Sequence, residues 1–256
     1  MAESDFFTPK RMRSLSQQAI DFLLPPRCFG CGVGIEQQGS LCADCWSGLH
    51  FITRPFCTIC GYPFEYDAGD GTLCSACLSQ EPPFQSARAV FRYDDGSKHL
   101  ILSFKHGDKT DGARAFGQLL YRAASDILQR TDRIIPVPLH RWRLFERRFN
   151  QSALIGQSLS RLTGLPLDTD HLIRHRSTES QGGLNRRQRH RNVQGAFKVR
   201  NGTVKPYHGQ TVVLVDDVYT TGATVSACAR ALLKAGAAEI HVLTLARVAE
   251  AARSHI

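Results

Sequence analysis

From about residue 87 onward, short apolar runs alternate with longer stretches in which apolar residues recur at helical spacing. The runs predict strands and the stretches between them predict helices. This alternation is typical of an α/β fold with a parallel sheet, whose strands are buried on both faces. We expect strands at 87–93, 134–138, 212–215 and 240–245, with a strand or crossover at 166–173. We expect helices at 95–104, 113–128, 149–162 and 225–235.

The periodic pattern begins only after an acidic, glycine-containing stretch at 65–71 and the pair Pro82-Pro83. Such punctuation marks a loop, so we place a domain boundary near 80–85. The chain then has three expected parts: an N-terminal segment with a short helix (1–24), a small domain (25–82) and the α/β domain (83–256).

The small domain contains four Cys-x-x-Cys pairs, and of the nine cysteines only Cys228 lies outside it. Two such pairs supply the four thiolates of a tetrahedral structural Zn²⁺ site. The thin aromatic core of this segment is too small to hold it together, and zinc binding, about 10–16 kcal/mol in finger peptides, would make up the deficit. We therefore expect two zinc ions, bound in chain order or with the pairs interleaved; redox-active pairs are the weaker alternative. The candidate ligands are Cys28, Cys31, Cys42, Cys45, Cys57, Cys60, Cys74 and Cys77.

The apolar run at 212–215 leads directly into the carboxylates of Asp216 and Asp217. They stand at the carboxyl end of the expected strand, where open α/β sheets bind ligands. Adjacent carboxylates repel each other unless donor groups or a cation relieve them, and the hydroxyls of a ribose diol are such donors. The small residues Thr220-Thr221-Gly222-Ala223-Thr224 then begin a helix, where backbone N–H groups suit a phosphate.

This stretch resembles the 5-phosphoribosyl-1-pyrophosphate (PRPP) motif of type I phosphoribosyltransferases, in which a hydrophobic strand precedes two acidic residues and Thr-Gly-x-Thr. The alternative is an ordinary strand, turn and helix with Asp and Thr caps. A second candidate loop follows the strand at 134–138 and contains Val137 and Pro138. The arginines after it could hold a pyrophosphate beside the strand end.

The formal charge of +9 is concentrated in one segment. Residues 139–200 contain 13 Lys or Arg and 4 Asp or Glu, an excess that equals the net charge of the whole chain. A positive face suits polyanions such as PRPP or nucleic acid. The alternative is a solvated, partly mobile basic loop, because 171–191 lacks hydrophobic periodicity. The candidate nucleic-acid contacts are Arg147, Arg148, Arg186 and Arg189.

The 42% hydrophobic content is that of a globular protein, and no apolar run approaches the length of a membrane span. The N-terminal residues lack the arrangement of a secretory signal. We therefore expect a cytoplasmic location, where reduced cysteines favour metal binding over disulfides.

With these parts placed, the chain resembles the ComF family from about 25 to 248: an N-terminal zinc ribbon joined to a phosphoribosyltransferase-like domain and associated with DNA uptake in natural transformation. One departure is at Arg147-Arg148-Phe149-Asn150-Gln151, since the family commonly has Arg-Gly-Phe-Asn-Gln. Besides the PRPP motif, the resemblance rests on Lys105 within Phe-Lys-His-Gly-Asp, on Pro136-Val137-Pro138, on Phe149-Asn150-Gln151, and on Gln181, Leu184, Arg186, Arg189, Asn192-Val193 and Phe197.

The resemblance implies a type I phosphoribosyltransferase-like parallel sheet with helices on both faces, preceded by a small double zinc ribbon. It assigns Asp216 and Asp217 to the ribose hydroxyls, 220–224 to the 5′-phosphate, and Lys105 with the loop around Val137 and Pro138 to pyrophosphate. If the protein is an active transferase, Asp216, Asp217 and Lys105 are its catalytic candidates, and Mg²⁺ would bridge pyrophosphate and ribose oxygens. Lys105 could equally be a surface lysine that follows a helix.

Three functions fit these features. The first is a competence-associated protein that handles single-stranded DNA, has competence-machinery proteins as partners, and uses a ribose-phosphate site for sensing or chemistry. The second is a metabolic phosphoribosyltransferase with an unidentified acceptor. The third is a non-catalytic regulator that senses PRPP or a nucleotide. The resemblance favours the first.

Overall fold

The computed structural model describes residues 25–67, 69–106, 112–177, 185–200 and 206–249. The short helix expected within 1–24 lies outside these residues. Among the described residues, no helix has the length and apolar character needed to cross a membrane.

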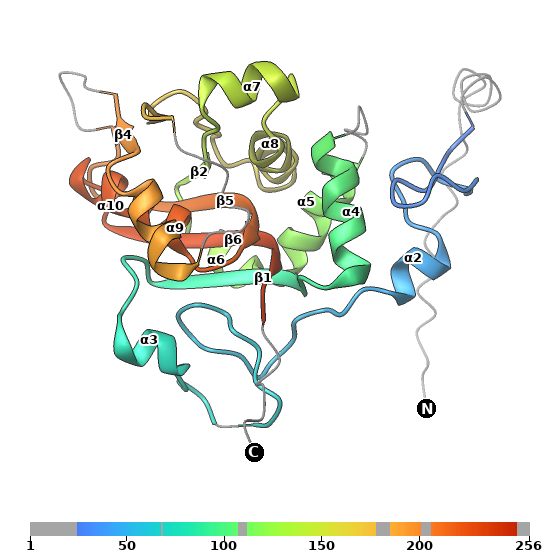
Figure 1. Cartoon of the computed structure of the whole chain (residues 1–256), viewed down its shortest axis with the longest axis horizontal. Helices are drawn as coiled ribbons and strands as arrows, with labels where there is room; N and C mark the ends of the chain where they lie inside the picture. Colours follow the sequence, from blue (N-terminus) through green and yellow to red (C-terminus); the bar gives the residue numbers. More distant parts are fainter. Residues whose placement is uncertain (1–24, 68, 107–111, 178–184, 201–205, 250–256) are drawn as a thin grey trace.

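A four-stranded parallel sheet with the order β1-β6-β5-β2 forms the centre of the molecule (Figure 1). In register, Ala87 of β1 pairs with Val242 of β6, and Val213 of β5 pairs with Ile134 of β2. The apolar run of β5 is fully buried, as the sequence predicted for a central parallel strand. The strands of this sheet are β1 (Ser86–Arg92), β2 (Arg133–Pro136), β5 (Thr211–Tyr219) and β6 (Glu239–Arg247).

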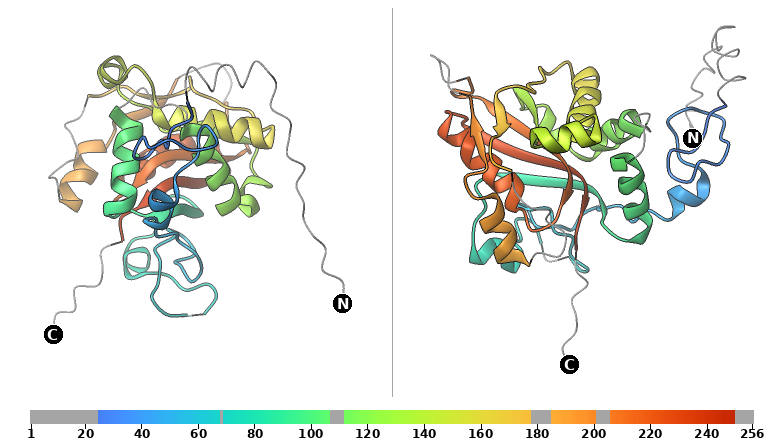
Figure 2. Two further views of the ribbon diagram at one scale, coloured as in Figure 1. Left: turned by 90° about the vertical axis from the view of Figure 1, so that its right-hand side faces the viewer. Right: turned by 45° about the horizontal axis from the view of Figure 1, so that its top comes forward.

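Helices cover both faces of this sheet (Figures 1 and 2). On one face, α5 and α8 pack together and bury Leu120 and Leu159 with Val213 of β5. On the other face, α10 buries Cys228 and Leu232. The helices are α2 (Ala43–Ser47), α3 (Ser75–Ser79), α4 (Asp95–His106), α5 (Gly112–Ala123), α6 (Ser125–Leu128), α7 (Arg141–Arg147), α8 (Gln151–Thr163), α9 (Arg186–Val193) and α10 (Ala223–Lys234).

Two segments differ from the sequence expectation, and a third, at 166–173, follows the crossover alternative. The helix expected at 113–128 is interrupted at Ala124, whose φ of −139° separates α5 from α6. The segment expected at 166–173 forms no strand of the main sheet; Leu167 makes one bridge to Ile134, and β3 (Leu172–Arg174) pairs antiparallel with β4 (Phe197–Val199). The basic stretch interpreted as a loop contains α9.

Helix α9 begins with a capping box. The Asn185 side chain accepts a hydrogen bond from the Gln188 N–H at 2.9 Å, and the Gln188 side chain accepts one from the Asn185 N–H at 2.8 Å. A polar helix of this kind has little hydrophobic periodicity, so the absence of periodicity does not exclude a helix here. The Asn-x-x-Gln spacing of a capping box is the sequence signal that indicates one.

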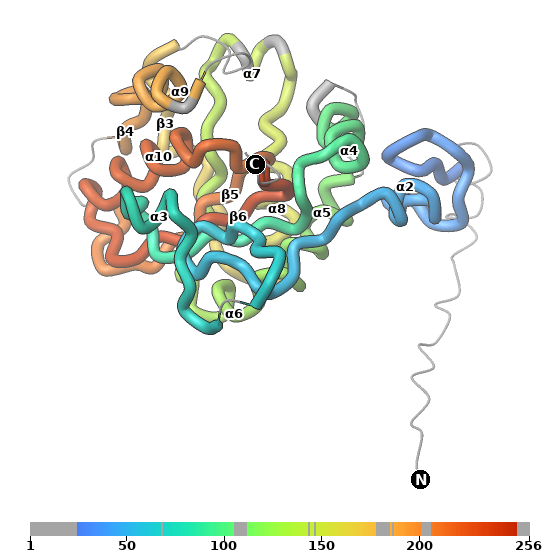
Figure 3. The backbone as a smooth tube through the Cα atoms, turned by 60° about the horizontal axis from the view of Figure 1, so that its bottom comes forward, coloured from blue at the N-terminus to red at the C-terminus, as the bar shows by residue number. Residues whose placement is uncertain are grey.

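The cysteine-rich segment lies along β1 and α4 (Figure 3). Between its two halves, residues 50–52 run antiparallel to β1, with hydrogen bonds from Ile52 N to Val90 O and from Arg92 N to His50 O, both at 2.8 Å. Further along β1, Ala87 N donates to Ile59 O. The segment therefore packs against the α/β fold along the whole outer edge of β1.

Candidate functional site

The cysteine sulfurs gather in two groups of four, and within each group all sulfurs lie within 4.8 Å of one another. The first group is Cys28, Cys31, Cys42 and Cys45, and the second is Cys57, Cys60, Cys74 and Cys77. The Cys31 and Cys42 sulfurs are 3.6 Å apart and the Cys60 and Cys74 sulfurs 3.5 Å apart. A tetrahedral zinc with Zn–S bonds of about 2.3 Å needs sulfurs about 3.8 Å apart, so each group fits one structural zinc. The ligands therefore pair in chain order and are not interleaved.

Backbone N–H groups support these centres. In each half a glycine N–H closes the knuckle on the first cysteine, from Gly32 to Cys28 O and from Gly61 to Cys57 O, both at 2.8 Å. These glycines have φ values of 82° and 68°, which favour glycine. The Cys42 N–H donates to the Cys28 sulfur at 3.3 Å. Burial raises the pKa of Cys28, but N–H donors outweigh it and lower this pKa to about 6, whereas burial raises the pKa of Cys45 in the same group.

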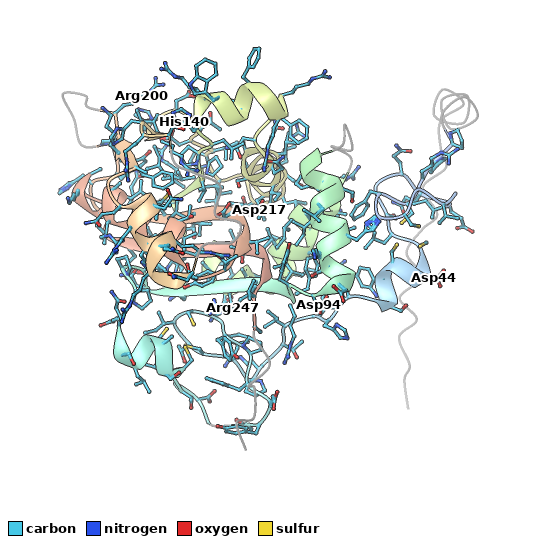
Figure 4. The ribbon with its side chains drawn as sticks, viewed as in Figure 1. Asp44, Asp94, His140, Arg200, Asp217 and Arg247 are labelled. Atoms are coloured by element: carbon cyan, nitrogen blue, oxygen red, sulfur yellow. The ribbon has the colours of Figure 1, made fainter. Side chains whose placement is uncertain are left out.

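Arg247, the last residue of β6, joins the second zinc centre to the sheet (Figure 4). Its guanidinium donates from Nη1 to Cys60 O at 2.7 Å and from Nη2 to the Cys60 sulfur at 3.2 Å. The same group lies over the Tyr219 ring, 4.1 Å from its centroid, and Arg247 is only 6% exposed. Sequence reasoning missed this residue; an arginine that ends an otherwise apolar strand was the available signal.

The two carboxylates lie where β5 continues beyond β2. The last bond between these strands runs from Val137 N to Val215 O at 2.9 Å, and the chain after β2 then becomes the proline-containing loop. Asp216 and Asp217 follow Val215 and are half-buried. β5 continues to Tyr219 beside β6, so the pair lies within the strand and not after its end as expected. Figure 4 shows Asp217 near the middle of the molecule.

Two polar residues at the start of α8 hold this arrangement together. Ser152 Oγ donates to Asp216 Oδ1 at 3.2 Å, and the Asp217 N–H donates to the same oxygen at 3.0 Å. The side chain of Asn150 caps α8 by accepting from Ser152 N at 3.1 Å and also donates to Val137 O at 3.1 Å. Asn150 and Ser152 thus position the loop after β2 against the carboxylates, a role for the asparagine of the Phe-Asn-Gln motif that sequence reasoning did not assign.

The loop at 220–224 forms the N-terminus of α10. Gly222 has a φ of 76°, and a Cβ at this position would collide with the Tyr219 hydroxyl. Ala223 N donates to Thr221 Oγ1 at 3.4 Å, and the N-cap residue itself, Gly222, has no side chain that could accept from the first turn. The first turn of a helix has N–H groups without partners inside the helix, so this end of α10 suits an anion.

A cavity of about 910 Å³ separates this loop from the second zinc ribbon. Thr220 and Thr221 line it on the loop side, Pro82 and Pro83 on the ribbon side, and Arg189 reaches it from α9. Two predicted groups from separate parts of the sequence, the phosphate loop and a basic residue of α9, thus border one cavity.

The other predicted residues lie elsewhere. Lys105 is in the last turn of α4 and Arg186 in the first turn of α9, but both side chains lie outside the described residues. Arg147 is half-buried at the end of α7, and Arg148 is exposed. Arg148 has a φ of 64°, so it keeps the left-handed turn for which the family commonly has glycine.

Two family models match the chain: a double zinc ribbon domain over residues 19–78 and a phosphoribosyl transferase domain over residues 152–255. Together with the two four-cysteine groups and the parallel sheet, they define the class of protein. It is a phosphoribosyltransferase-type fold that carries an N-terminal double zinc ribbon with structural zinc sites.

The chain also matches curated proteins over most of its length. It is 33% identical to competence protein F of Haemophilus influenzae, covering 86% of this chain and 96% of that protein. It is 34% identical to DNA utilization protein YhgH of Escherichia coli (strain K12), covering 88% and 98%. It is 28% identical to competence protein ComFC of Bacillus subtilis (strain 168), covering 83% and 86%. The chain therefore belongs to the ComF family.

Proposed function

We propose that this protein binds PRPP, or a related ribose 5-phosphate, at the β5–α10 loop and that it handles single-stranded DNA in natural competence. The observation that carries the ligand proposal is the position of two half-buried carboxylates directly before an N-terminal helix turn that suits an anion. A ribose diol and a 5′-phosphate match these two groups in chemistry and in order along the chain.

Each residue has a distinct part in this proposal. Asp216 and Asp217 accept hydrogen bonds from the ribose hydroxyls, and residues 220–224 surround the 5′-phosphate. The loop at Val137 and Pro138, which Asn150 joins to the site, faces the pyrophosphate, with Lys105 as a predicted cation there. Carboxylate oxygens are ligands that Mg²⁺ accepts, so the donor set suits Mg²⁺ bound together with PRPP. That ion would neutralise pyrophosphate charge.

The DNA part of the proposal is supported by relatives and by charge. Competence protein F and DNA utilization protein YhgH match this chain over nearly their whole lengths. The excess positive charge lies between 139 and 200, and Arg189 of this segment borders the cavity beside the phosphate loop. Arg147, Arg148 and Arg186 are the remaining predicted DNA contacts. Phosphate contacts would make binding fall with salt, with a log–log slope of about −0.7 per phosphate of a single strand.

Calorimetric titration with PRPP and Mg²⁺ tests the ligand. We expect binding by the wild type, at least about tenfold weaker binding by Asp217→Asn, and a smaller loss for Thr221→Ala. Each substitution removes one protein group that would form a hydrogen bond with the ligand. Asp44→Asn is the matched control, since this exposed aspartate lies on α2, far from Asp217 (Figure 4). If all four proteins bind PRPP equally, or none binds, the site assignment is wrong.

Fluorescence anisotropy with labelled oligo-dT tests the DNA role. We expect binding at low salt that weakens steeply as salt is added; an absence of binding at low salt would reject this part of the proposal. Release of pyrophosphate from PRPP, measured with and without the oligonucleotide, then shows whether turnover accompanies binding.

A further inference from the structure

Helix α7 displays two large aromatic side chains to solvent. Trp142 is 68% exposed and Phe145 is 85% exposed. They are three residues apart on one helix and therefore lie on the same face. Figures 1 and 3 place α7 at the periphery of the molecule, and Figure 4 shows its side chains projecting away from the body. Two such rings side by side on a surface are typical of an interaction site.

Arginines flank these rings along the sequence. Helix α7 has the sequence Arg-Trp-Arg-Leu-Phe-Glu-Arg, and Arg148 follows it. Arg141 and Arg148 are exposed at its two ends. Aromatic rings between arginines are the combination with which proteins bind single-stranded nucleic acid, because bases stack on the rings while arginines contact phosphates.

We propose that α7 is a stacking platform for the bases of single-stranded DNA. This inference rests on the proposed DNA role and assigns it to a surface that neither the zinc ribbons nor the PRPP motif includes. The rings are separated by about 4.5 Å along the helix axis, against about 3.4 Å per nucleotide along a strand of duplex DNA, so they match neighbouring bases of a slightly extended strand. Bases in a duplex are already stacked on each other and offer no free face.

The charge of α7 argues against a second copy of this chain as the occupant. A symmetric contact through the face of Trp142 and Phe145 would bring the arginines of one α7 close to those of the other, and like charges at short distance repel. A polyanion has the opposite effect, since each phosphate neutralises an arginine and releases counterions.

The position of α7 connects the platform to the ribose-phosphate site. Its N-cap is His140, the last residue of the loop that begins at Val137, and Asn150 binds Val137 O. A DNA strand bound on α7 would therefore lie at the His140 end of this loop. The other end of the loop, at Val137, lies beside the carboxylate site.

The test is oligo-dT binding by the double variant Trp142→Ala/Phe145→Ala. We expect binding at least about 30-fold weaker than that of the wild type, because stacking contributes about 1–3 kcal/mol per base and the variant removes two rings. The slope of affinity against salt should stay unchanged, since no cation is removed. The zinc content and melting temperature should also stay unchanged, because both side chains are exposed.

Two controls make this test specific. Tyr66→Ala removes another ring, 72% exposed, that lies between acidic residues of the second ribbon, and it should bind oligo-dT like the wild type. The exchange Trp142→Phe/Phe145→Trp keeps two rings and should retain binding. An abasic strand, which has phosphates but no bases, should bind the wild type and the double variant equally.

Fluorescence gives an independent readout. The chain has two tryptophans, so Trp46→Phe leaves Trp142 as the only one, and stacking of bases on it should quench its emission as oligo-dT is added. Wild-type affinity in the double variant, or unquenched Trp142 emission while anisotropy reports binding, would overturn the platform but leave the DNA role intact. A wild-type dimer that the double variant breaks would assign α7 to self-association instead. Failure of the wild type to bind any oligonucleotide would reject the DNA role itself.

Discussion

Each zinc ribbon has two Cys-x-x-Cys pairs, separated by 10 residues in the first ribbon and 13 in the second, but the two ribbons join the rest of the molecule differently. In the first ribbon Cys31 is exposed, and Cys42 and Cys45 are half-buried. In the second, Cys57 is 0% exposed and Cys60 3% exposed. The four cysteines of the second ribbon belong to one of the two main hydrophobic cores, whereas the first ribbon contributes Phe29 to the other core, with Leu41 packed against it and Leu49 at the ribbon's border.

The difference comes from residues outside the cysteine motif. Gly61 lies so close to β1 that a Cβ on it would be 2.6 Å from Ala87 O, and Arg247 donates two hydrogen bonds to Cys60. The first ribbon is anchored by the edge-to-face packing of Phe29 on Phe116, with ring centroids 5.2 Å apart, and by Gly48, which lies so close to α4 that a Cβ on Gly96 would collide with Gly48 O. Two four-cysteine metal motifs of one chain can therefore differ in how far the core buries their ligands.

The largest effect should come from Cys60→Ser compared with Cys42→Ser. Loss of the second centre removes buried ligands from the main core, so we expect Cys60→Ser to lower the stability of the whole chain by about 4 kcal/mol or more, or to prevent folding. Cys42→Ser should unfold only the first ribbon and leave PRPP binding close to that of the wild type. Thermal melting, zinc content and limited proteolysis distinguish the two outcomes.

Equal destabilisation by these two substitutions would show that both ribbons are integrated to the same degree. The isosteric serine keeps side-chain size, so a difference between the variants reports the lost zinc and not a cavity.

The second largest effect should come from Arg247→Met. This change keeps an unbranched side chain but removes the donors to Cys60 and the cation over the Tyr219 ring, which borders Gly222. We expect a loss of stability of about 3 kcal/mol, because buried acceptors lose a charged donor. PRPP affinity, measured by calorimetry, should fall about tenfold because the loop loses its support.

Lys234→Met is the matched control for Arg247→Met, since it removes an exposed cation from the end of α10. If both variants keep wild-type stability and PRPP affinity, Arg247 does not connect the second centre to the loop.

Zinc release gives a third, kinetic comparison. With a chelator and a zinc-sensitive dye, we expect two phases, the faster from the first centre because Cys31 is exposed there. Cys42→Ser should remove the faster phase and leave the slower one. If both zinc ions leave in a single phase, the unequal burial of the two centres does not control the rate of zinc release.

The smallest effect should come from the contact that the link between the ribbons makes with the residue before α4. In this contact His50 Nδ1 lies 2.8 Å from Asp94 Oδ2. Burial raises the pKa of Asp94, but the Ser97 N–H and His50 outweigh it, so this pKa lies below its ordinary value. The contribution of the ionised Asp94 side chain to the free energy of unfolding is therefore complete above the pKa of an unfolded aspartate, about 3.9. It is lost as the pH falls through the lower pKa of the folded state.

Because His50 is largely exposed, Asp94→Asn should cost no more than about 1 kcal/mol at neutral pH. Chemical denaturation of both proteins should give free energies of unfolding that converge as the pH is lowered below about 4. A constant difference across that range would mean that the carboxylate charge is not the source of the effect.

The sequence alone predicted the helices and strands in which apolar residues form a clear pattern. The run at Val212–Val215 and the residues after it predicted β5 and α10 within a few positions, since buried parallel strands are continuously apolar. The eight ligands followed from spacing, but their pairing did not, because both pairings satisfy the same motif. Only the fold decides which sulfurs meet.

What the sequence did not reveal depends on contacts between distant segments. Arg247 meets Cys60 across 187 positions, and Ser152 meets Asp216 across 64. Helix α7 was interpreted only as a basic cluster, because two exposed rings interrupt any amphipathic pattern there. Such pairings have no local signature, so periodicity and motifs cannot supply them.

The link at residues 50–52 has a consequence for self-association. β1 is an edge strand, and an open edge offers unpaired N–H and C=O groups to any passing strand, which promotes aggregation. Here the link bonds to Val90 and Arg92, and Ile59 bonds to Ala87, so irregular backbone shields the edge along its length. The cysteine-rich segment thus covers the edge of the sheet. A chain that begins at β1 would expose this edge, and we expect its copies to assemble with one another by edge-to-edge strand pairing.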